Sequence, residues 1–179
     1  MHATLIPASS ASAFLAAPEA ELTALAEQLR GCETPGEAAW KLAEAAGRLL
    51  GLIDCVIYLR SRTHASLVQV AAWGSKQVAP GILENPIRLP IGLGVVGACA
   101  RDRVPVVITD TRLDYRYVPD VDDNRSELAI PLIRRGQLVG VLDTEHPEPD
   151  YYSSQHIRAL LKLAEAFAAC EAIGYLMEA

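Results

Sequence analysis

Cysteine, aromatic side chains and positive charge are all scarce in this sequence of 179 residues. Its four cysteines form no CxxC pair and lie in apolar or helical stretches, where a free thiol behaves as a small hydrophobe. We therefore expect a reducing compartment. The formal net charge is −6, and no stripe of Lys and Arg is present on which a phosphate backbone could lie. Nucleic acid is not an expected partner.

Long hydrophobic runs are also missing. A helix that crosses a bilayer needs about 20 apolar residues in a row, and no such run without a charge occurs in the sequence. The segment 1–17 contains no Lys or Arg, and its apolar runs are too short for a signal peptide. These absences predict a cytoplasmic protein that does not enter a membrane.

The composition that is present, 51% hydrophobic and 21% charged, is typical of an ordinary globular domain. A chain of this length can bury enough surface to fold without disulfides or a structural metal. We expect a flexible tail over residues 1–17 and a single domain over residues 18–179.

Hydrophobic periodicity predicts helices at both ends of the domain. Leucines and alanines recur at three and four residues between 18 and 51, and two breaks at glycine divide this region into a helical hairpin. Thr34 and Glu37 form a capping box at the start of the second helix. Ser153 or Ser154 caps a terminal helix of about 25 residues that reaches the end of the chain.

Between these helices, β-branched and aromatic residues predict a series of short strands. A tight turn at Arg135-Gly136 joins the last two of them, a short helix of two turns begins near Gly92, and the long segment 110–125 has no periodicity and is read as a loop. The expected strands cover residues 53–60, 67–73, 87–89, 104–108, 127–133 and 138–143.

The string Gly92-x-Gly94-x-x-Gly97 matches the dinucleotide-binding fingerprint in its letters. That fingerprint has meaning only between a first parallel strand and a long crossover helix. Here only about ten residues separate Gly94 from the next strand, the minimum for any parallel crossover. A tight strand-to-helix turn beside a pocket explains the glycines better.

Several short motifs together resemble the GAF family. They are the Gly92-x-Gly94-x-x-Gly97 string, Asp110 after a Pro-Val-Val-Ile strand, Ser126-Glu127 before Leu-Ala-Ile-Pro-Leu-Ile, Gly140-Val-Leu-Asp143, and a Ser-capped terminal helix. Each motif is weak alone, but their order and spacing are specific to that family. The resemblance covers about residues 35–179.

The resemblance implies an α+β fold. An antiparallel sheet of five to six strands is expected, with the N- and C-terminal helices on one face and a ligand pocket on the other, under the long loop. Members of the family bind small molecules and pass a signal through their helices to a partner or output domain. One subfamily, the free methionine-(R)-sulfoxide reductases, uses a catalytic thiolate in the same pocket.

The reductase chemistry can be tested against the sequence residue by residue. The subfamily pattern resembles Gly-x-Gly-Val-Cys-Gly, and its cysteine position falls on Val96; no second cysteine stands near Asp120 in the loop. A valine cannot replace a sulfur nucleophile. The chain keeps the acidic pattern of that pocket in Glu127, Asp143 and Glu145. Cys99 lies one helical turn beyond the site and is read as core packing.

The long loop combines aromatic and guanidinium groups that could cover a polar ligand and neutralise a carboxylate. The alternative is a solvated acidic loop whose arginines pair with its own aspartates, and the sequence leaves both open. Three histidines, His64, His146 and His156, lack the spacing of metal ligands, so no metal is expected. The residues expected to bind ligand are Trp73, Tyr115, Arg116, Tyr117, Glu127 and Asp143, with Tyr58 in addition.

These observations predict a non-catalytic sensory or regulatory domain that binds a small, anionic or zwitterionic metabolite whose identity the sequence does not give. Two alternatives remain: a reductase-like enzyme that uses Cys99, and a dimerisation module without a ligand. We also expect a homodimer, because the terminal helix carries a second apolar stripe that a partner could bury. The residues of that stripe are Leu163, Cys170, Ile173 and Met177.

Overall fold

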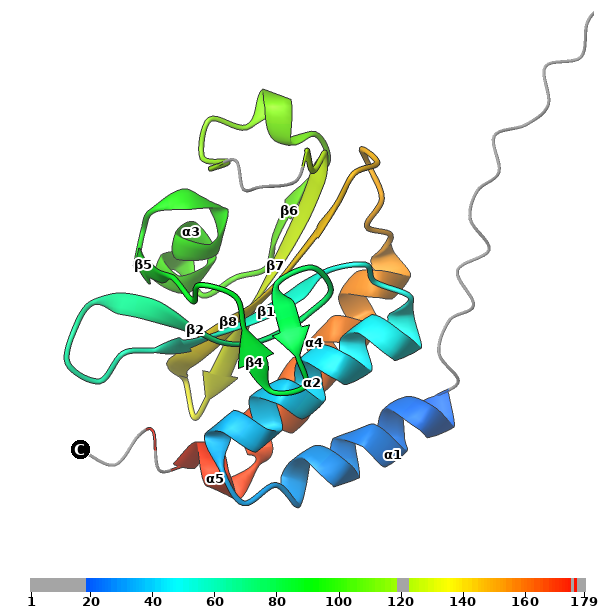
Figure 1. Cartoon of the computed structure of the whole chain (residues 1–179), viewed down its shortest axis with the longest axis vertical. Helices are drawn as coiled ribbons and strands as arrows, with labels where there is room; N and C mark the ends of the chain where they lie inside the picture. Colours follow the sequence, from blue (N-terminus) through cyan, green and yellow to red (C-terminus); the bar gives the residue numbers. More distant parts are fainter. Residues whose placement is uncertain (1–18, 119–122, 175, 177–179) are drawn as a thin grey trace, which may run out of the picture.

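A layer of helices packs on one face of an antiparallel sheet, as the sequence predicts (Figure 1). The computed structural model describes residues 19–118, 123–174 and 176. The tail predicted over 1–17 and the Met177 position of the apolar stripe lie outside the described residues. Within them, no helix is long and apolar enough to cross a bilayer.

The main sheet has six strands in the order β5-β2-β1-β8-β7-β6, and every neighbouring pair is antiparallel. A separate small sheet, which the sequence analysis missed, is formed by β3 and β4. The strands are β1 Cys55–Arg60, β2 Ser66–Trp73, β3 Gln77–Ala79, β4 Ile82–Leu83, β5 Arg88–Pro90, β6 Val106–Ile108, β7 Ser126–Arg134 and β8 Gln137–His146.

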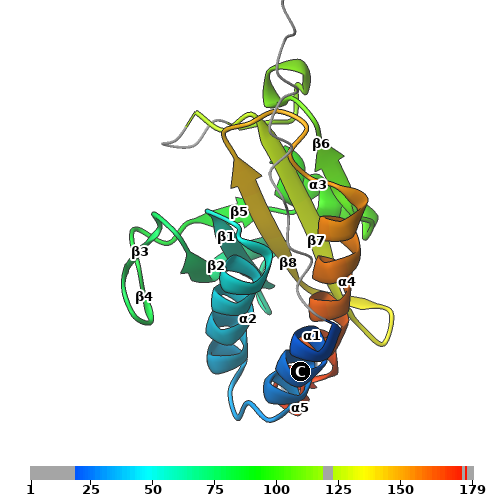
Figure 2. The ribbon, with the colours of Figure 1, turned by 90° about the vertical axis from the view of Figure 1, so that its right-hand side faces the viewer.

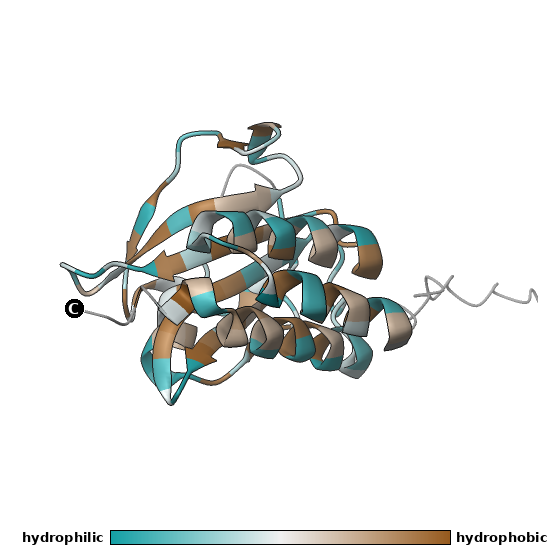
Figure 3. Cartoon of the chain, turned by 90° about the horizontal axis from the view of Figure 1, so that it is seen from below, coloured by the Kyte–Doolittle hydropathy of each residue, from teal (hydrophilic) through white to brown (hydrophobic). Residues whose placement is uncertain are grey.

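The helices α1, α2, α4 and α5 lie on one side of the sheet, and α3 lies on the other (Figure 2). α2 and α4 pack on the strands, while α1 packs on α4 and α2. Hydrophilic and hydrophobic bands alternate along these helices, which is the pattern of amphipathic segments (Figure 3). The helices are α1 Glu19–Arg30, α2 Pro35–Leu50, α3 Gly94–Asp102, α4 Ser154–Ala169 and α5 Glu171–Gly174, with a 3-10 turn at Thr111–Leu113.

Local signals in the sequence set the helix starts and the tightest turn. The Thr34 hydroxyl accepts a hydrogen bond from the Glu37 amide at 3.1 Å, and the Glu37 carboxylate accepts one from the Glu33 amide at 3.0 Å. Ser153 caps α4. Arg135 and Gly136 have φ values of 48° and 77°, as the predicted turn between β7 and β8 requires.

The terminal helix is not continuous, which corrects the sequence prediction. α4 ends at Ala169, and Cys170 leaves the helical region with a ψ of 133°. The Arg134 guanidinium, which comes from β7, donates to the carbonyls of Ala168 and Cys170, the second at 2.8 Å. A cation from a distant strand therefore binds the exposed carbonyls where the helix breaks.

The apolar stripe that predicted a homodimer is buried within one chain. Leu163, Cys170 and Ile173 are each fully buried in the core under the helices. Both N-terminal helices were expected on the sheet, but α1 lies on α4 and covers the stripe. These three described residues of the stripe therefore offer no surface to a partner. The homodimer stays a prediction that they no longer support.

Candidate functional site

A bulge between β1 and β2 decides which side chains face away from the helices. Ile57 pairs with Ala71 and Tyr58 with Gln69, so β2 carries one extra residue, Val70. The extra residue reverses the odd-even alternation along β2. Leu67 packs on the open face of the sheet, whereas Ala71 and Trp73 pack under the helices.

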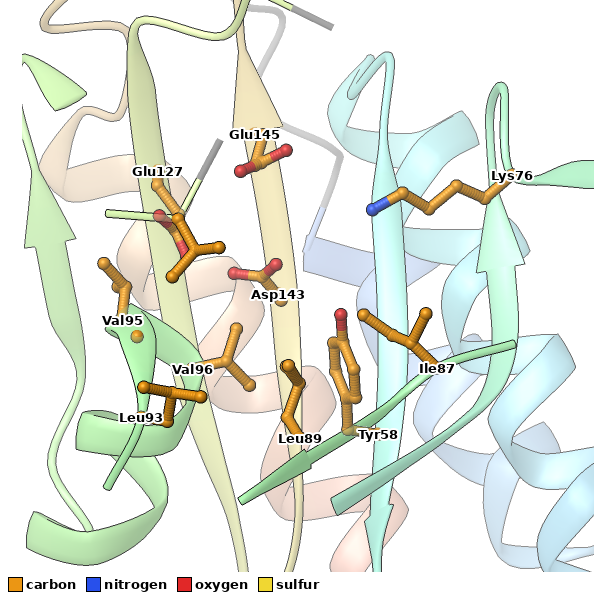
Figure 4. A pocket seen from close by; sticks show the side chains of 12 residues that line it. Tyr58, Lys76, Ile87, Leu89, Leu93, Val95, Val96, Glu127, Asp143 and Glu145 are labelled. Atoms are coloured by element: carbon orange, nitrogen blue, oxygen red, sulfur yellow. The ribbon is translucent and has the colours of Figure 1, made fainter. Parts of the chain in front are cut away.

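The open face carries a cavity of about 150 Å³ between α3, β5 and the centre of the sheet (Figure 4). Its walls are mostly apolar, and its polar groups are three carboxylates, one phenol and one ammonium. The lining residues are Tyr58, Lys76, Ile87, Leu89, Leu93, Gly94, Val95, Val96, Val118, Glu127, Asp143 and Glu145.

Three acidic side chains gather on β7 and β8 because of the strand register. Glu127 pairs directly with Glu145, and Asp143 lies two residues before Glu145 on the same face of β8. The exposed fractions of Glu127, Asp143 and Glu145 are only 4%, 4% and 7%. Asp143 Oδ1 is buried and accepts no hydrogen bond from the described residues.

Burial changes the proton affinity of these acids. Removal from water raises the pKa of Glu127 to about 8, and the charge of Glu145 adds to this, while a hydrogen bond with Asp143 acts in the opposite direction. Burial also raises the pKa of Asp143 well above its usual range, with further contributions from Glu127 and Glu145. Both acids therefore hold their protons more tightly than solvated carboxyls do, and a positive charge beside them favours their ionised forms.

Two polar side chains complete the cavity. Gln69 donates to the Tyr58 hydroxyl at 3.1 Å and accepts from the Ile87 amide at 3.1 Å, so it fixes the phenol and the chain that enters β5. Lys76 reaches in from the link between β2 and β3 and points toward the acids (Figure 4). Its positive charge lowers the pKa of both Glu127 and Asp143, which opposes the effect of burial.

The glycine string forms the turn into α3, and close packing explains it. A Cβ on Gly97 would lie 2.8 Å from the Pro90 carbonyl oxygen and 3.0 Å from the Gly92 nitrogen. The Gly92 amide also donates to the Gly97 carbonyl at 2.8 Å. The prediction of a tight strand-to-helix turn beside a pocket is confirmed, since β5 precedes the string and residues of the turn line the cavity.

The cysteine position of the reductase pattern faces this cavity and holds Val96. Cys99, on the same helix, is fully buried and does not line the cavity. Burial raises the pKa of its thiol, and the charges of Asp143 and Glu127 raise it further, so the thiolate is disfavoured. All four cysteines are free and buried.

The structure brings together three of the residues expected to bind ligand, Tyr58, Glu127 and Asp143. Trp73 lies on the opposite face because the β2 bulge turns it under the helices. Its indole N–H donates to the Leu52 carbonyl at 2.9 Å, and its ring occupies the space where a side chain on Gly47 would stand. Lys76 was missed, since a single lysine in a link gives no signal in the sequence.

The long loop contributes less to the cavity than expected. Tyr115 is 97% exposed, Tyr117 is half-buried, and neither lines the cavity. Arg116 binds Asp114 at 2.7 Å, so it does not face the cavity as a free cation. In the described part of this loop, Val118 lines the wall of the cavity.

The other loop arginines pair in the same way, with Arg112 and Arg125 both on Asp110. These pairs fit the alternative of a loop neutralised by its own charges. Asp110 accepts hydrogen bonds from both guanidinium groups, which hold the pKa of its carboxyl well below the usual range.

The histidines have structural contacts. His146 stacks on Tyr151 with ring centroids 3.5 Å apart, and His156 Nδ1 accepts from the Ser153 amide at 3.1 Å. Among the residues that the structure describes, no three His, Cys, Asp or Glu side chains are placed to hold a metal ion.

The sequence profile of the GAF domain family matches residues 32–170, and the chain belongs to this family. The observed α+β fold, an antiparallel six-stranded sheet with helices, agrees with this assignment. No curated protein sequence matches the chain.

Solved structures with the same fold include a GAF domain of a phosphotransferase, a putative GAF sensor protein and a reductase. The GAF domain of an Acinetobacter phosphoenolpyruvate-protein phosphotransferase superposes with a TM-score of 0.75 at 17% identity, covering 87% of this chain and 92% of that one. A free methionine-R-sulfoxide reductase from Neisseria meningitidis superposes with a TM-score of 0.71 at 22% identity, covering 96% and 98%. A putative GAF sensor protein from Burkholderia vietnamiensis gives 0.70 at 20% identity, covering 87% and 97%. At these identities the likeness shows the fold alone.

Proposed function

We propose that this chain is a non-catalytic GAF-type sensory domain whose acidic cavity binds a small ligand through a positively charged group. The observation that carries the proposal is the buried Asp143 Oδ1, which has no hydrogen-bond partner among the described residues and stands beside two more buried carboxylates. A buried acceptor without a partner is costly, and a ligand N–H group would satisfy it.

The size and walls of the cavity narrow the ligand class. A cavity of about 150 Å³ is comparable to one that holds a benzene-sized molecule. The apolar walls from α3 and β5 suit a short hydrocarbon part, and the acidic floor suits an ammonium group. A small amine or an amino-acid zwitterion therefore fits better than the anion that the sequence left open.

Val96 supports a binding role rather than catalysis. The reductase subfamily would need a thiolate at this position, and valine has no nucleophile to offer. The reductase alternative through Cys99 is disfavoured by the burial of that thiol. The open cavity also favours a sensor over the alternative of a dimerisation module whose pocket is filled by its own side chains.

A single introduced cysteine tests the charge of the cavity directly. Because the native cysteines are buried, Val96→Cys gives one thiol that faces the cavity. We expect a cationic methanethiosulfonate reagent to label it at least about tenfold faster than an anionic reagent of the same size. Ala24→Cys, on an exposed position of α1, is the matched control and should show a much smaller preference. Equal rates at Val96→Cys would refute a cation site.

The ligand itself can be sought in two ways. Native mass spectrometry of protein purified without denaturation should show added mass if a ligand is retained. A panel of amines and amino acids, including methionine and its sulfoxide, should shift backbone amide signals of α3 and β8 in NMR spectra. We expect no turnover of free methionine sulfoxide by the wild type, and turnover that Cys99→Ser abolishes would overturn the non-catalytic assignment.

Signal output through the helices, a homodimer and a cytoplasmic location remain parts of this proposal. The helical layer that covers the other face of the sheet supports transmission to a partner, because β1 and β8 contact both the cavity and this layer. Light scattering at micromolar concentration checks the oligomeric state.

A further inference from the structure

Lys76 stands at the base of the β3–β4 hairpin as well as in the cavity. Its backbone carbonyl accepts a hydrogen bond from the Glu84 amide at 2.9 Å, where the hairpin ends. The preceding turn is fixed by Gly74, which has a φ of 99° and whose Cβ would lie 2.3 Å from the Ile53 carbonyl oxygen. The Lys76 backbone is therefore bonded to the end of the hairpin and follows a turn whose geometry is constrained.

The hairpin has little structure of its own to hold it. β3 has three residues and β4 two, and the pair forms a sheet separate from the main one. Val78 and Ile82 are 57% and 55% exposed. An isolated two-stranded hairpin is marginal in water, so side-chain anchors such as that of Lys76 matter for its position.

On its other side the hairpin forms the wall of a second, larger hollow. This groove has a volume of about 630 Å³ and lies between the hairpin and α2. Trp40 and Trp73, the two tryptophans of the chain, both line it. The hairpin contributes Gln77, Ala79, Pro80 and Gly81 to the same groove. One short segment thus borders the acidic cavity at residue 76 and the tryptophan groove at residues 77–81.

We propose that Lys76 is a built-in counter-cation of the acidic cavity, which the positive group of a ligand displaces, so that binding releases the β3–β4 hairpin beside the tryptophan groove. This inference rests on the proposed function, since it assumes a cationic ligand group. The Lys76 ammonium and that group are attracted by the same three carboxylates in a space of about 150 Å³. Two like charges so close repel each other in a poorly solvated site, and the flexible lysine is the one that can leave.

The first test needs no ligand. Lys76→Gln removes the charge, and hydrogen exchange of the Gln77 and Glu84 amides should become at least about fivefold faster. Lys41→Gln, a change of the same kind on α2, should leave these amides unchanged, and Lys76→Arg should restore the wild-type rates. Wild-type exchange in Lys76→Gln overturns the proposal, because the hairpin would then be held without the lysine.

The second test uses n-butylammonium chloride as the probe, n-butanol as its neutral match and sodium chloride to keep the ionic strength constant. We expect Lys76→Gln to bind the ammonium about tenfold more tightly than the wild type, since the competing cation is gone. In the wild type, saturation by the probe should change tryptophan fluorescence and speed exchange of the hairpin amides; butanol should do neither.

The outcomes separate the two proposals. Equal or weaker binding of the probe by Lys76→Gln, with a wild type that binds, overturns displacement and leaves the cation site intact. Binding by both proteins without a change in fluorescence or exchange overturns the release of the hairpin. If neither protein binds the probe, the cation site of the proposed function fails, and displacement fails with it.

Discussion

The two faces of the main sheet differ in how closely and with which side chains they are packed. Under the helices, large side chains such as Phe167, Leu160 and Leu142 are fully buried in one continuous apolar core. On the open face, a smaller apolar cluster surrounds a cavity with three buried carboxylates. Close-packed apolar contacts stabilise the fold, whereas buried charge and empty space cost stability. The difference indicates that the helical face maintains the structure, and the open face is where we propose that a ligand binds.

The largest expected effect tests the helical face. Phe167→Ala removes a fully buried ring from between α4 and the sheet, and we expect it to lower the free energy of unfolding by about 3–5 kcal/mol. Val96→Ala, beside the existing cavity, should cost only about 1 kcal/mol. Urea denaturation measures both, and a loss for Val96→Ala as large as that for Phe167→Ala would end the distinction between the faces.

The next effect concerns the break after α4. Arg134→Met keeps the aliphatic stem but removes the guanidinium that donates to the carbonyls of Ala168 and Cys170. A loss of about 1.5–3 kcal/mol is expected, since these hydrogen bonds involve a charged donor. Arg135→Met, at the neighbouring exposed position, should change the free energy of unfolding by less than about 0.5 kcal/mol. An equal effect of the two variants would contradict the role of Arg134.

The buried acids of the open face should make the free energy of unfolding depend on pH. Glu127 has a pKa raised to about 8 in the folded protein, whereas an unfolded glutamate titrates near 4.3. Between these values the folded state binds more protons than the unfolded state, so the free energy of unfolding falls as pH rises. The contribution of this one group is at most about 1.4 kcal/mol per pH unit. This loss of stability is complete near pH 8, because there the carboxyl also ionises in the folded protein.

Glu127→Gln should flatten that slope. It removes one titrating group, and it also removes a charge that raises the pKa of Asp143. The charges of Glu145, Asp114 and Lys76 also act on this position and stay in the variant. Glu44→Gln, on the exposed surface of α2, is the control and should keep the wild-type profile. Part of the slope should remain, because burial also raises the pKa of Asp143. A slope equal to that of the wild type would show that the Glu127 carboxyl titrates as a solvated one.

The smallest effect compares the starts of two helices. Thr34→Ala removes the side-chain cap of α2 and should lower the free energy of unfolding by about 1 kcal/mol, while Thr34→Ser should keep most of the cap. On the open face, α3 begins at Leu93, which is 53% exposed and makes no capping hydrogen bond. Leu93→Ala should therefore cost less than Thr34→Ala, and thermal unfolding of the two variants checks the order.

The sequence was informative where a feature depends on local residues. The helix starts, the Arg135-Gly136 turn and the period of each long strand follow from neighbouring side chains, so the element order was predicted well. Glu127 and Asp143 were expected because they keep the acidic pattern of the pocket in the subfamily that the sequence resembles.

Features that depend on distant partners could not be predicted in this way. The break at Cys170 needs a guanidinium from β7, and the burial of its apolar stripe needs α1 on α4 instead of on the sheet. The side of the sheet on which Trp73 lies depends on a bulge that pairing with β1 creates. Lys76 lines the cavity because the link between β2 and β3, on which it stands, runs beside that cavity.

The extra residue on β2 also determines which single-codon deletions this strand can tolerate. Val70 and Ala71 both pack toward the helices, so the alternation of faces is already regular without one of them. Loss of the Val70 codon would leave Gln69 beside Tyr58 and Trp73 under the helices. Loss of the Val68 codon, which precedes the bulge, would instead turn the start of the strand over and move Leu67 away from the open face. The bulge is therefore a point at which this strand tolerates a change of one residue in length while the pocket keeps its composition.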